Sequence, residues 1–441
     1  MKKIKIASIL VLAYLLTGCE FQPLHEELET SSIELSQEQE TMTDLSTELI
    51  TTEETEIATT EEETIPPTPT TVILRCMETL EVNQEITLKD FVISKNVLLQ
   101  SEDSLVDTSQ IGIFEITIPY YYGTEIREEV LSYRVQDTTP PVILNDGTNA
   151  FIKTGEEFNL KNLIGYGDNY DHAPSLTYEG DVNTSVAGNY MLIAYLTDNS
   201  GNQSSCRLTV TVGDTEPDEL SNQQKINFSD FVSEYKNSNV IFGIDVSKWQ
   251  GYINYDAVKQ AGCEFVLMRI GYSYDSNPEL DEYYLYNIDS AKKAGLKVGV
   301  YFYTTDTTES QIRADANWII EKLDGRDLDM PIAFDWEDFK NFQKYDISLH
   351  DLNLLWTAFA DELNQNGYDS MLYSSKYFLE NVWENPDNNT IWLAHYTQNT
   401  NYEGNYFLWQ RTNAGIINGV DVPVDFNILY QNQIEKLDNA E

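Results

Sequence analysis

The sequence predicts a multidomain protein in which N-terminal all-β modules precede a C-terminal α/β barrel of irregular type. With 441 residues, the chain is too long for one ordinary domain. Residues 72–212 contain apolar, alternating or β-branched runs that are typical of strands. After residue 239, apolar strand candidates alternate with helical stretches, as an α/β barrel requires.

The composition limits the partners of the protein. The formal net charge is −46 and the isoelectric point is near 4.1, whereas the hydrophobic content of 41% is sufficient for a sizeable core. So much negative charge disfavours binding to nucleic acid phosphates, and we predict no nucleic-acid partner. Simple electrostatic attraction to an anionic membrane or wall polymer is disfavoured too. Work at such a surface would need another form of attachment.

The N-terminus suggests that attachment. Residues 1–18 have the basic start and short apolar run of a signal peptide, and the run is too short to span a bilayer comfortably. The sequence L-T-G-C at its end resembles the bacterial lipobox, which implies cleavage before Cys19 and lipidation of its thiol. An ordinary secretory signal with an incidental cysteine is the alternative. The lipobox reading predicts a protein anchored by lipid to the extracellular face of the bacterial membrane.

Two kinds of segment separate this anchor from the barrel. Residues 19–71 consist largely of Glu, Thr and Ser and are predicted to form a disordered, self-repelling stalk. Residues 72–136 and 137–213 echo each other at an offset of about 72 to 76 residues, which predicts a tandem repeat. The second unit opens with D-T-T-P-P-V and carries a D-N-S-G-N turn, and it resembles the Ig-like sandwich modules of bacterial surface proteins. The first lacks that turn and matches less well.

We expect both modules to act as spacers, with glycan binding as the alternative. Asp168, Asp171 and Asp198 are the residue types of a Ca²⁺ site, but solvated loops are the favoured interpretation, and no metal or other cofactor is predicted. Residues 214–239 are polar and are predicted to be a linker, apart from a short helical stretch at residues 228–235. The barrel is predicted over residues 240–434, followed by a tail, 435–441.

Eight strand candidates follow the linker at regular intervals: 240–244, 265–270, 297–303, 331–334, 370–373, 390–394, 406–409 and 423–426. Helical stretches intervene at 283–294, 310–323 and 349–366. Eight strands in about 200 residues leave little room for eight full βα units, so the predicted barrel is TIM-like but lacks or shortens several helices.

Polar and aromatic residues gather where these strands end. Asp335 and Glu337 close the fourth strand in the sequence A-F-D-W-E, and alternation along a strand places them on the same face. Two carboxylates held this close favour unequal pKa values, which is the requirement for cleaving a glycosidic bond. For D-x-E alone, an acidic strand end entering a solvated loop is the simpler interpretation. The other strand ends add Asp245 and Asp425, which predicts one acidic pocket at the rim.

Aromatic and polar candidates for sugar binding are Trp249, Tyr301, Tyr303, Trp336, Tyr373, His395, Trp409 and Gln410. Core packing is the alternative for the three tryptophans.

The order of these strands resembles a known family. The sequences F-G-I-D-V-S-K-W-Q-G at 242–251, P-I-A-F-D-W-E at 331–337 and V-D-F-N at 424–427 are similar to those of the family 25 glycoside hydrolases, the muramidase-type lysozymes. Matching strands also occur at 265–271, 299–303, 392–396 and 409–410.

The resemblance implies hydrolysis of the β-1,4 bond between N-acetylmuramic acid and N-acetylglucosamine in the glycan strands of peptidoglycan. It implies that Glu337 is the proton donor, that Asp335 stabilises positive charge, and that Asp245 and Asp425 complete the pocket. Attack by the second carboxylate and attack by the substrate's own acetamido group both stay open, as do retention and inversion. The alternative functions are a non-catalytic peptidoglycan-binding protein or adhesin on the same barrel, and an enzyme with another glycan substrate.

Overall fold

The computed structural model describes residues 73–145, 149–216, 224–237, 239–384, 386 and 389–431. The predicted signal peptide, Cys19, the stalk and the C-terminal tail lie outside these residues. Within the described part of the chain, no helix combines the length and apolar character needed to cross a membrane. The chain divides into two compact units, with the boundary between Asp137 and Thr138.

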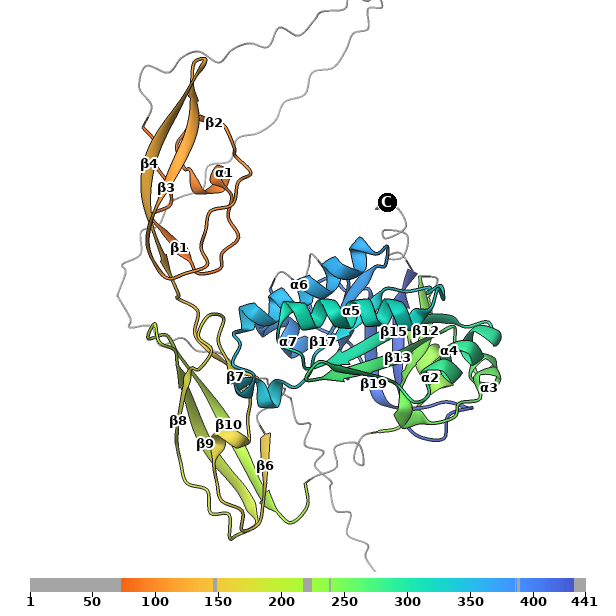
Figure 1. Ribbon diagram of the computed structural model, residues 1–441. Helices are drawn as coiled ribbons and strands as arrows, with labels where there is room; N and C mark the ends of the chain where they lie inside the picture. Colours follow the sequence, from red (N-terminus) through yellow and green to blue (C-terminus); the bar gives the residue numbers. More distant parts are fainter. Residues whose placement is uncertain are drawn as a thin grey trace, which may run out of the picture. The chain divides into compact units, whose positions relative to one another are not determined.

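The first unit contains a four-stranded sheet of order β1-β4-β3-β2 (Figure 1). Its elements are β1 (Thr79–Glu81), α1 (Leu88–Phe91), β2 (Leu98–Leu99), β3 (Gly112–Tyr122) and β4 (Glu125–Gln136). β3 and β4 form a long antiparallel hairpin, and β1 adds to β4 in parallel. Phe91 and Val135 are fully buried in its core.

The second unit begins with a small β module. Its four-stranded sheet has the order β6-β10-β9-β8, and a two-stranded sheet joins β5 to β7. The bounds are β5 (Val142–Ile143), β6 (Asn149–Lys153), β7 (Tyr166–Gly167), β8 (Ser175–Glu179), β9 (Gly188–Thr197) and β10 (Gln203–Gly213), with a 3₁₀ turn η1 (Leu160–Asn162). As in the first unit, a long antiparallel hairpin carries one parallel strand and one antiparallel strand at its edges. The repeat seen in the sequence is therefore also a repeat of topology.

The rest of the second unit is a closed barrel of eight strands, with the helices outside it (Figure 1). The strands are β12 (Val240–Val246), β13 (Phe265–Tyr274), β15 (Lys297–Thr304), β16 (Ile332–Asp335), β17 (Ser370–Ser375), β18 (Ile391–Ala394), β19 (Leu408–Ile416) and β20 (Val424–Tyr430). Each of the eight predicted strands is present. The helices are α3 (Tyr255–Gln260), α4 (Tyr284–Lys293), α5 (Glu309–Leu323), α6 (Leu349–Gln365) and α7 (Lys376–Asn381), with 3₁₀ turns η3 (Lys248–Gln250) and η4 (Phe339–Lys344).

Local chemistry explains where the long helices begin. Thr308 and Gln311 form a reciprocal capping box at the start of α5, and Ser348 and Asp351 form another at the start of α6. The strands between the helices are buried on both faces. Every residue of β16 is buried, which explains why this segment is a continuous apolar run rather than an alternating one.

Two features differ from the sequence-based expectation. The barrel is not fully parallel, because β20 runs antiparallel to both of its neighbours, β12 and β19. Furthermore, the predicted linker 214–239 contains β11 (Ile226–Asn227), which pairs with β19, and its expected helical stretch, α2 (Phe228–Tyr235), packs on the barrel. The side chains of Phe228 and Phe231 are buried against Phe426 of the barrel, so this segment belongs to the barrel core.

Candidate active site

Four carboxylates from three strand ends meet in one cavity of the barrel. The cavity has a volume of about 160 Å³ and is lined by Asp245, Tyr301, Asp335, Glu337, Tyr373, Trp392, Tyr396, Gln410 and Asp425. Asp335 ends β16 and Asp245 is near the end of β12. Asp425 lies at the start of β20, and the reversed direction of that strand pairs it with Asp245. The antiparallel strand therefore delivers its first residues, not its last, to the rim.

Asp245 is held by two amides that are themselves fixed. Gln410 Nε2 and Asn427 Nδ2 donate to Asp245 Oδ2 at 2.9 and 2.7 Å. The Gln410 oxygen accepts from the hydroxyls of Tyr373 and Tyr396 at 2.9 and 2.8 Å, which turns its NH₂ group toward the carboxylate. In the same way, Trp392 Nε1 donates to Asn427 Oδ1 at 2.9 Å. Donors on both sides stabilise the ionised form of Asp245.

The four carboxyl groups have raised pKa values. Burial raises the pKa of Asp245 to about 6, although the bonds from the two amides lower it. Burial, and then the charge of neighbouring acids, raise the pKa values of Asp335 and Asp425 well above the usual range. The Glu337 side chain is exposed at the cavity mouth, but surrounding protein atoms still desolvate its carboxyl group and raise its pKa to about 7.

The environments of Asp335 and Glu337 differ. The two carboxyl groups interact directly and so exchange protons as a pair. Asp335 is only 5% exposed, and the positive charge of Arg269 favours its ionised form. Arg269 is fixed in turn by the buried Asp281, whose Oδ2 lies 2.9 Å from Nε and 2.8 Å from Nη2. The hydrogen bond between them raises the pKa of Asp335 and lowers that of Glu337, so the two groups share a proton, and of the two only Glu337 has an exposed side chain that a ligand in the cavity can reach.

A family match accompanies this geometry. Residues 244–420 match the model of glycosyl hydrolases family 25. The matched segment runs from β12 to the loop before β20 and includes Asp245, Asp335 and Glu337.

Two curated proteins are similar to part of the chain. The autolytic lysozyme of Clostridium acetobutylicum is 27% identical over 189 residues, which is 42% of this chain and 54% of that protein. The chain thus spans about half the length of that curated relative. An uncharacterised protein, YegX, of Escherichia coli K12 is 24% identical over 213 residues, 45% of this chain and 73% of that protein.

Two solved structures are also similar to part of the chain. The autolysin LytC of Streptococcus pneumoniae, in complex with a synthetic peptidoglycan ligand, is 22% identical with a TM-score of 0.40, covering 54% of this chain and 56% of that one. A family 25 glycosyl hydrolase of Bacillus anthracis is 21% identical with a TM-score of 0.40, covering 46% and 95%.

The structure places the predicted sugar-binding residues in different surroundings. Tyr301, Tyr373 and Gln410 line the cavity. Trp249, which is 73% exposed, lies on the surface with the Lys248 amine 5.3 Å from its ring centre. Tyr303 packs beside Tyr274, and His395 bonds to Thr400 at 2.9 Å; neither is among the residues that line the cavity.

Two tryptophans are corrections to the sequence-based prediction. Trp336 has no exposed surface, because its ring packs among Phe339, Phe342 and Tyr345. Trp409 is 3% exposed and donates from Nε1 to the His395 carbonyl oxygen at 2.9 Å. Both are therefore core residues that a sugar cannot contact.

Sequence reasoning missed several residues that line or support the cavity. Trp392 and Tyr396 line it, and Asn427 holds Asp245 from β20, but none of the three was predicted as a site residue. Arg269 offered a signal, since a charged residue stands in the middle of an apolar strand, and such a residue requires a partner. Its partner Asp281 has no comparable signal, because it lies on the segment after β14 (Asn277–Leu280).

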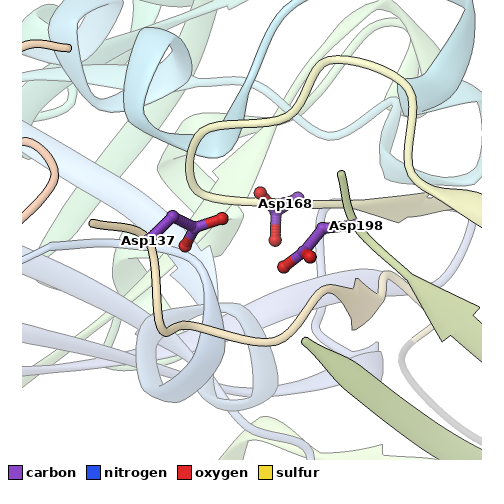
Figure 2. A group of neighbouring side chains, drawn as sticks. All are labelled: Asp137, Asp168 and Asp198. Carbon is purple, nitrogen blue, oxygen red and sulfur yellow. The ribbon is translucent and has the colours of Figure 1, made fainter. Parts of the chain in front are cut away.

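A second acidic group lies in the β modules. Figure 2 shows Asp137, Asp168 and Asp198 turned toward one another from three separate segments, with carboxylate oxygens all within 4.8 Å. Asp171, named with the latter two in the sequence analysis, is not in this group and accepts a hydrogen bond from Asn199 N at 3.0 Å. Asp168 accepts from the amides of two following residues and Asp198 from Asn202, which explains their loop conformations. We assign no ligand to this group.

Proposed function

We propose that this protein is a lipid-anchored cell-wall hydrolase that cleaves the β-1,4 bond between N-acetylmuramic acid and N-acetylglucosamine in peptidoglycan. The observation that carries the proposal is the cavity in which Glu337, with a pKa near 7, stands beside the buried Asp335 in a family 25 domain. The name of the Clostridium relative, an autolytic lysozyme, supports the same bond type.

In this mechanism Glu337 donates its proton to the glycosidic oxygen as the bond to the sugar carbon breaks. Water then adds to that carbon, either directly or after attack by Asp335 or by the substrate's acetamido group, and returns a proton to Glu337. A group with a pKa near the working pH is protonated often enough to act and acidic enough to transfer the proton. Asp335 stabilises the positive charge that develops on the sugar ring, and Asp245 adds negative potential behind it. Tyr301, Tyr373 and Gln410 are proposed to contact the sugar within the cavity, and Trp249, Tyr303 and His395 to contact it farther along the glycan strand.

Reducing-end analysis of purified peptidoglycan digested by the protein tests the proposal. We expect new muramic acid reducing ends. Glucosamine ends would show that the enzyme cuts the other glycosidic bond. Release of no ends, together with retained binding to the glycan, would favour the non-catalytic binding protein. The anomeric form of the fresh product separates retention from inversion.

The proposed location depends on the lipobox. Replacement of Cys19 by Ala is expected to prevent lipidation and to move the protein from the membrane fraction to the soluble fraction. Detergent-phase partitioning of the two forms measures this, and equal partitioning would contradict the anchor. We also propose that the two β modules between the anchor and the barrel are Ig-like domains.

A further inference from the structure

The β module at residues 138–213 packs directly on the segment that follows the catalytic strand. We propose that this module is a positioning element for Asp335 and Glu337 and not only a spacer. The inference rests on the proposed function for its catalytic consequence. Its structural part, the link between the module and the D-W-E segment, can be measured independently.

Two glycines of the module make the closest approach. A Cβ atom at Gly165 would overlap the carbonyl oxygen of Phe339 and would lie 2.7 Å from the carbonyl carbon. A Cβ atom at Gly167 would lie 2.7 and 2.8 Å from two ring atoms of Phe342. Both contacts fall on η4, which begins two residues after Glu337. Only glycine leaves room for this approach of the module to η4.

Hydrogen bonds and apolar contacts surround these glycines. Gln343 Nε2 donates to the Lys161 carbonyl oxygen at 2.9 Å, and the Leu349 amide at the start of α6 donates to the Asp168 carbonyl oxygen at 2.7 Å. Tyr377 of α7 donates its hydroxyl to the Ile143 carbonyl oxygen at 2.6 Å. Leu144, which is 1% exposed, lies in the same hydrophobic core as the barrel residues. A mere tether would not share a core and backbone hydrogen bonds with its neighbour.

The contact reaches the catalytic carboxyl groups in two short steps. The amide of Phe339, whose carbonyl group meets Gly165, donates to the Glu337 carbonyl oxygen at 2.8 Å. The ring of Phe342, which meets Gly167, lies 5.8 Å from the ring of Trp336. Trp336 separates Asp335 from Glu337 in the chain and is fully buried. Displacement of η4 would therefore move the backbone that sets the position of both carboxyl groups.

The test is the substitution Gly165→Ala in the full-length protein, with Gly213→Ala as its matched control. Gly213 ends β10 of the same module, and a Cβ atom there would meet nothing closer than a Phe151 ring carbon at 3.5 Å. We expect Gly165→Ala to reduce kcat on peptidoglycan by about 10-fold or more, because small displacements of catalytic groups have effects of this size. KM should change little, and the basic limb of the pH profile should move, because the surroundings of Glu337 change.

Amide hydrogen exchange across residues 335–345 provides a readout that needs no activity. Exchange should be faster in Gly165→Ala than in wild type, and unchanged in Gly213→Ala. If Gly165→Ala does not fold, Gln343→Ala is a milder change that removes the side-chain hydrogen bonds to the Lys161 and Ile164 carbonyl oxygens. It should increase exchange over the same residues and lower kcat about threefold.

The outcomes separate the two proposals. A wild-type protein that releases no sugar ends would overturn the proposed function, while faster exchange in the variant would still support the structural link. A folded Gly165→Ala or Gln343→Ala variant with wild-type kcat and wild-type exchange would overturn the positioning role itself.

Discussion

The described residues of the barrel include two acidic groups that differ in access to a ligand. The first is the cavity of Asp245, Asp335, Glu337 and Asp425. The second is the pair Asp306 and Asp315, each 2% exposed. In both groups a carboxyl group has a pKa near 7: burial and then the charge of Asp306 raise the pKa of Asp315 to about 7. A raised pKa alone therefore does not separate a catalytic acid from a structural one.

The partners of the two groups explain the difference. Ser273 and the Ser276 amide donate to Asp306 at 2.6 and 2.8 Å, and Thr304 donates to Asp315 at 3.0 Å. These contacts tie β13, β15 and α5 together, and neither aspartate is among the residues that line the cavity. Glu337, in contrast, is exposed to the cavity. Access to a ligand, rather than the pKa, distinguishes the proposed active site from the pair Asp306 and Asp315.

The largest expected effect is on turnover, and it is measured by replacing one carboxyl group with an amide in the cavity and one in the pair Asp306 and Asp315. Glu337→Gln keeps the shape of the side chain but removes the transferable proton, so turnover should fall at least about 100-fold. Asp315→Asn retains an acceptor for Thr304 and should stay within about twofold of wild type. Initial rates on purified peptidoglycan, with folding checked by circular dichroism, measure both. Comparable rates for the two variants would remove Glu337 as the acid.

A smaller effect is expected from Asp245→Asn, which tests whether the carboxylates influence one another across the cavity. Asp245 contributes to the raised pKa of Glu337 through its negative charge. Removal of that charge should lower the pKa of Glu337, so the basic limb of the pH–rate profile should move from near 7 to lower pH. The profile of Asp315→Asn should keep the wild-type limb. A limb that stays in place in Asp245→Asn would show that burial alone sets the pKa.

Much of the barrel could be predicted because each of its strands is a local apolar run. Asp335 and Glu337 line one cavity, as the D-x-E pattern predicts, but β16 ends at Asp335, so strand alternation does not determine the direction of Glu337. The direction of β20 was not predictable in this way, because an apolar run looks the same in either direction. The burial of Trp336 was equally hidden, as it depends on Phe342 and Tyr345, which are distant from the strand pattern.

The boundary before the barrel was misplaced for a related reason. Polar residues dominate 214–239, so the segment has the composition of a linker. Among its described residues only the side chains of Phe228 and Phe231 are buried, and they pack against Phe426, almost 200 residues away. The docking of residues 138–213 likewise depends on glycines, whose role is visible only when the opposing backbone is known.

The smallest expected effect is a change in protein stability, and it concerns the pair Asp306 and Asp315. Because the pKa of Asp315 in the folded protein is about 7 and that of an unfolded aspartate is about 3.9, the folded state binds its proton more tightly. Asp315 therefore contributes a loss of stability as pH rises from about 4 to about 7, and a constant penalty above that range. Asp315→Asn should remove this loss, changing the slope of the unfolding free energy by up to about 1.4 kcal/mol per pH unit within that window. The cavity acids contribute equally to both proteins, so the difference between urea denaturation curves at several pH values isolates Asp315. Parallel pH dependences would show that Asp315 is ionised in the folded protein, and the resemblance between the two acidic groups would then be confined to their burial.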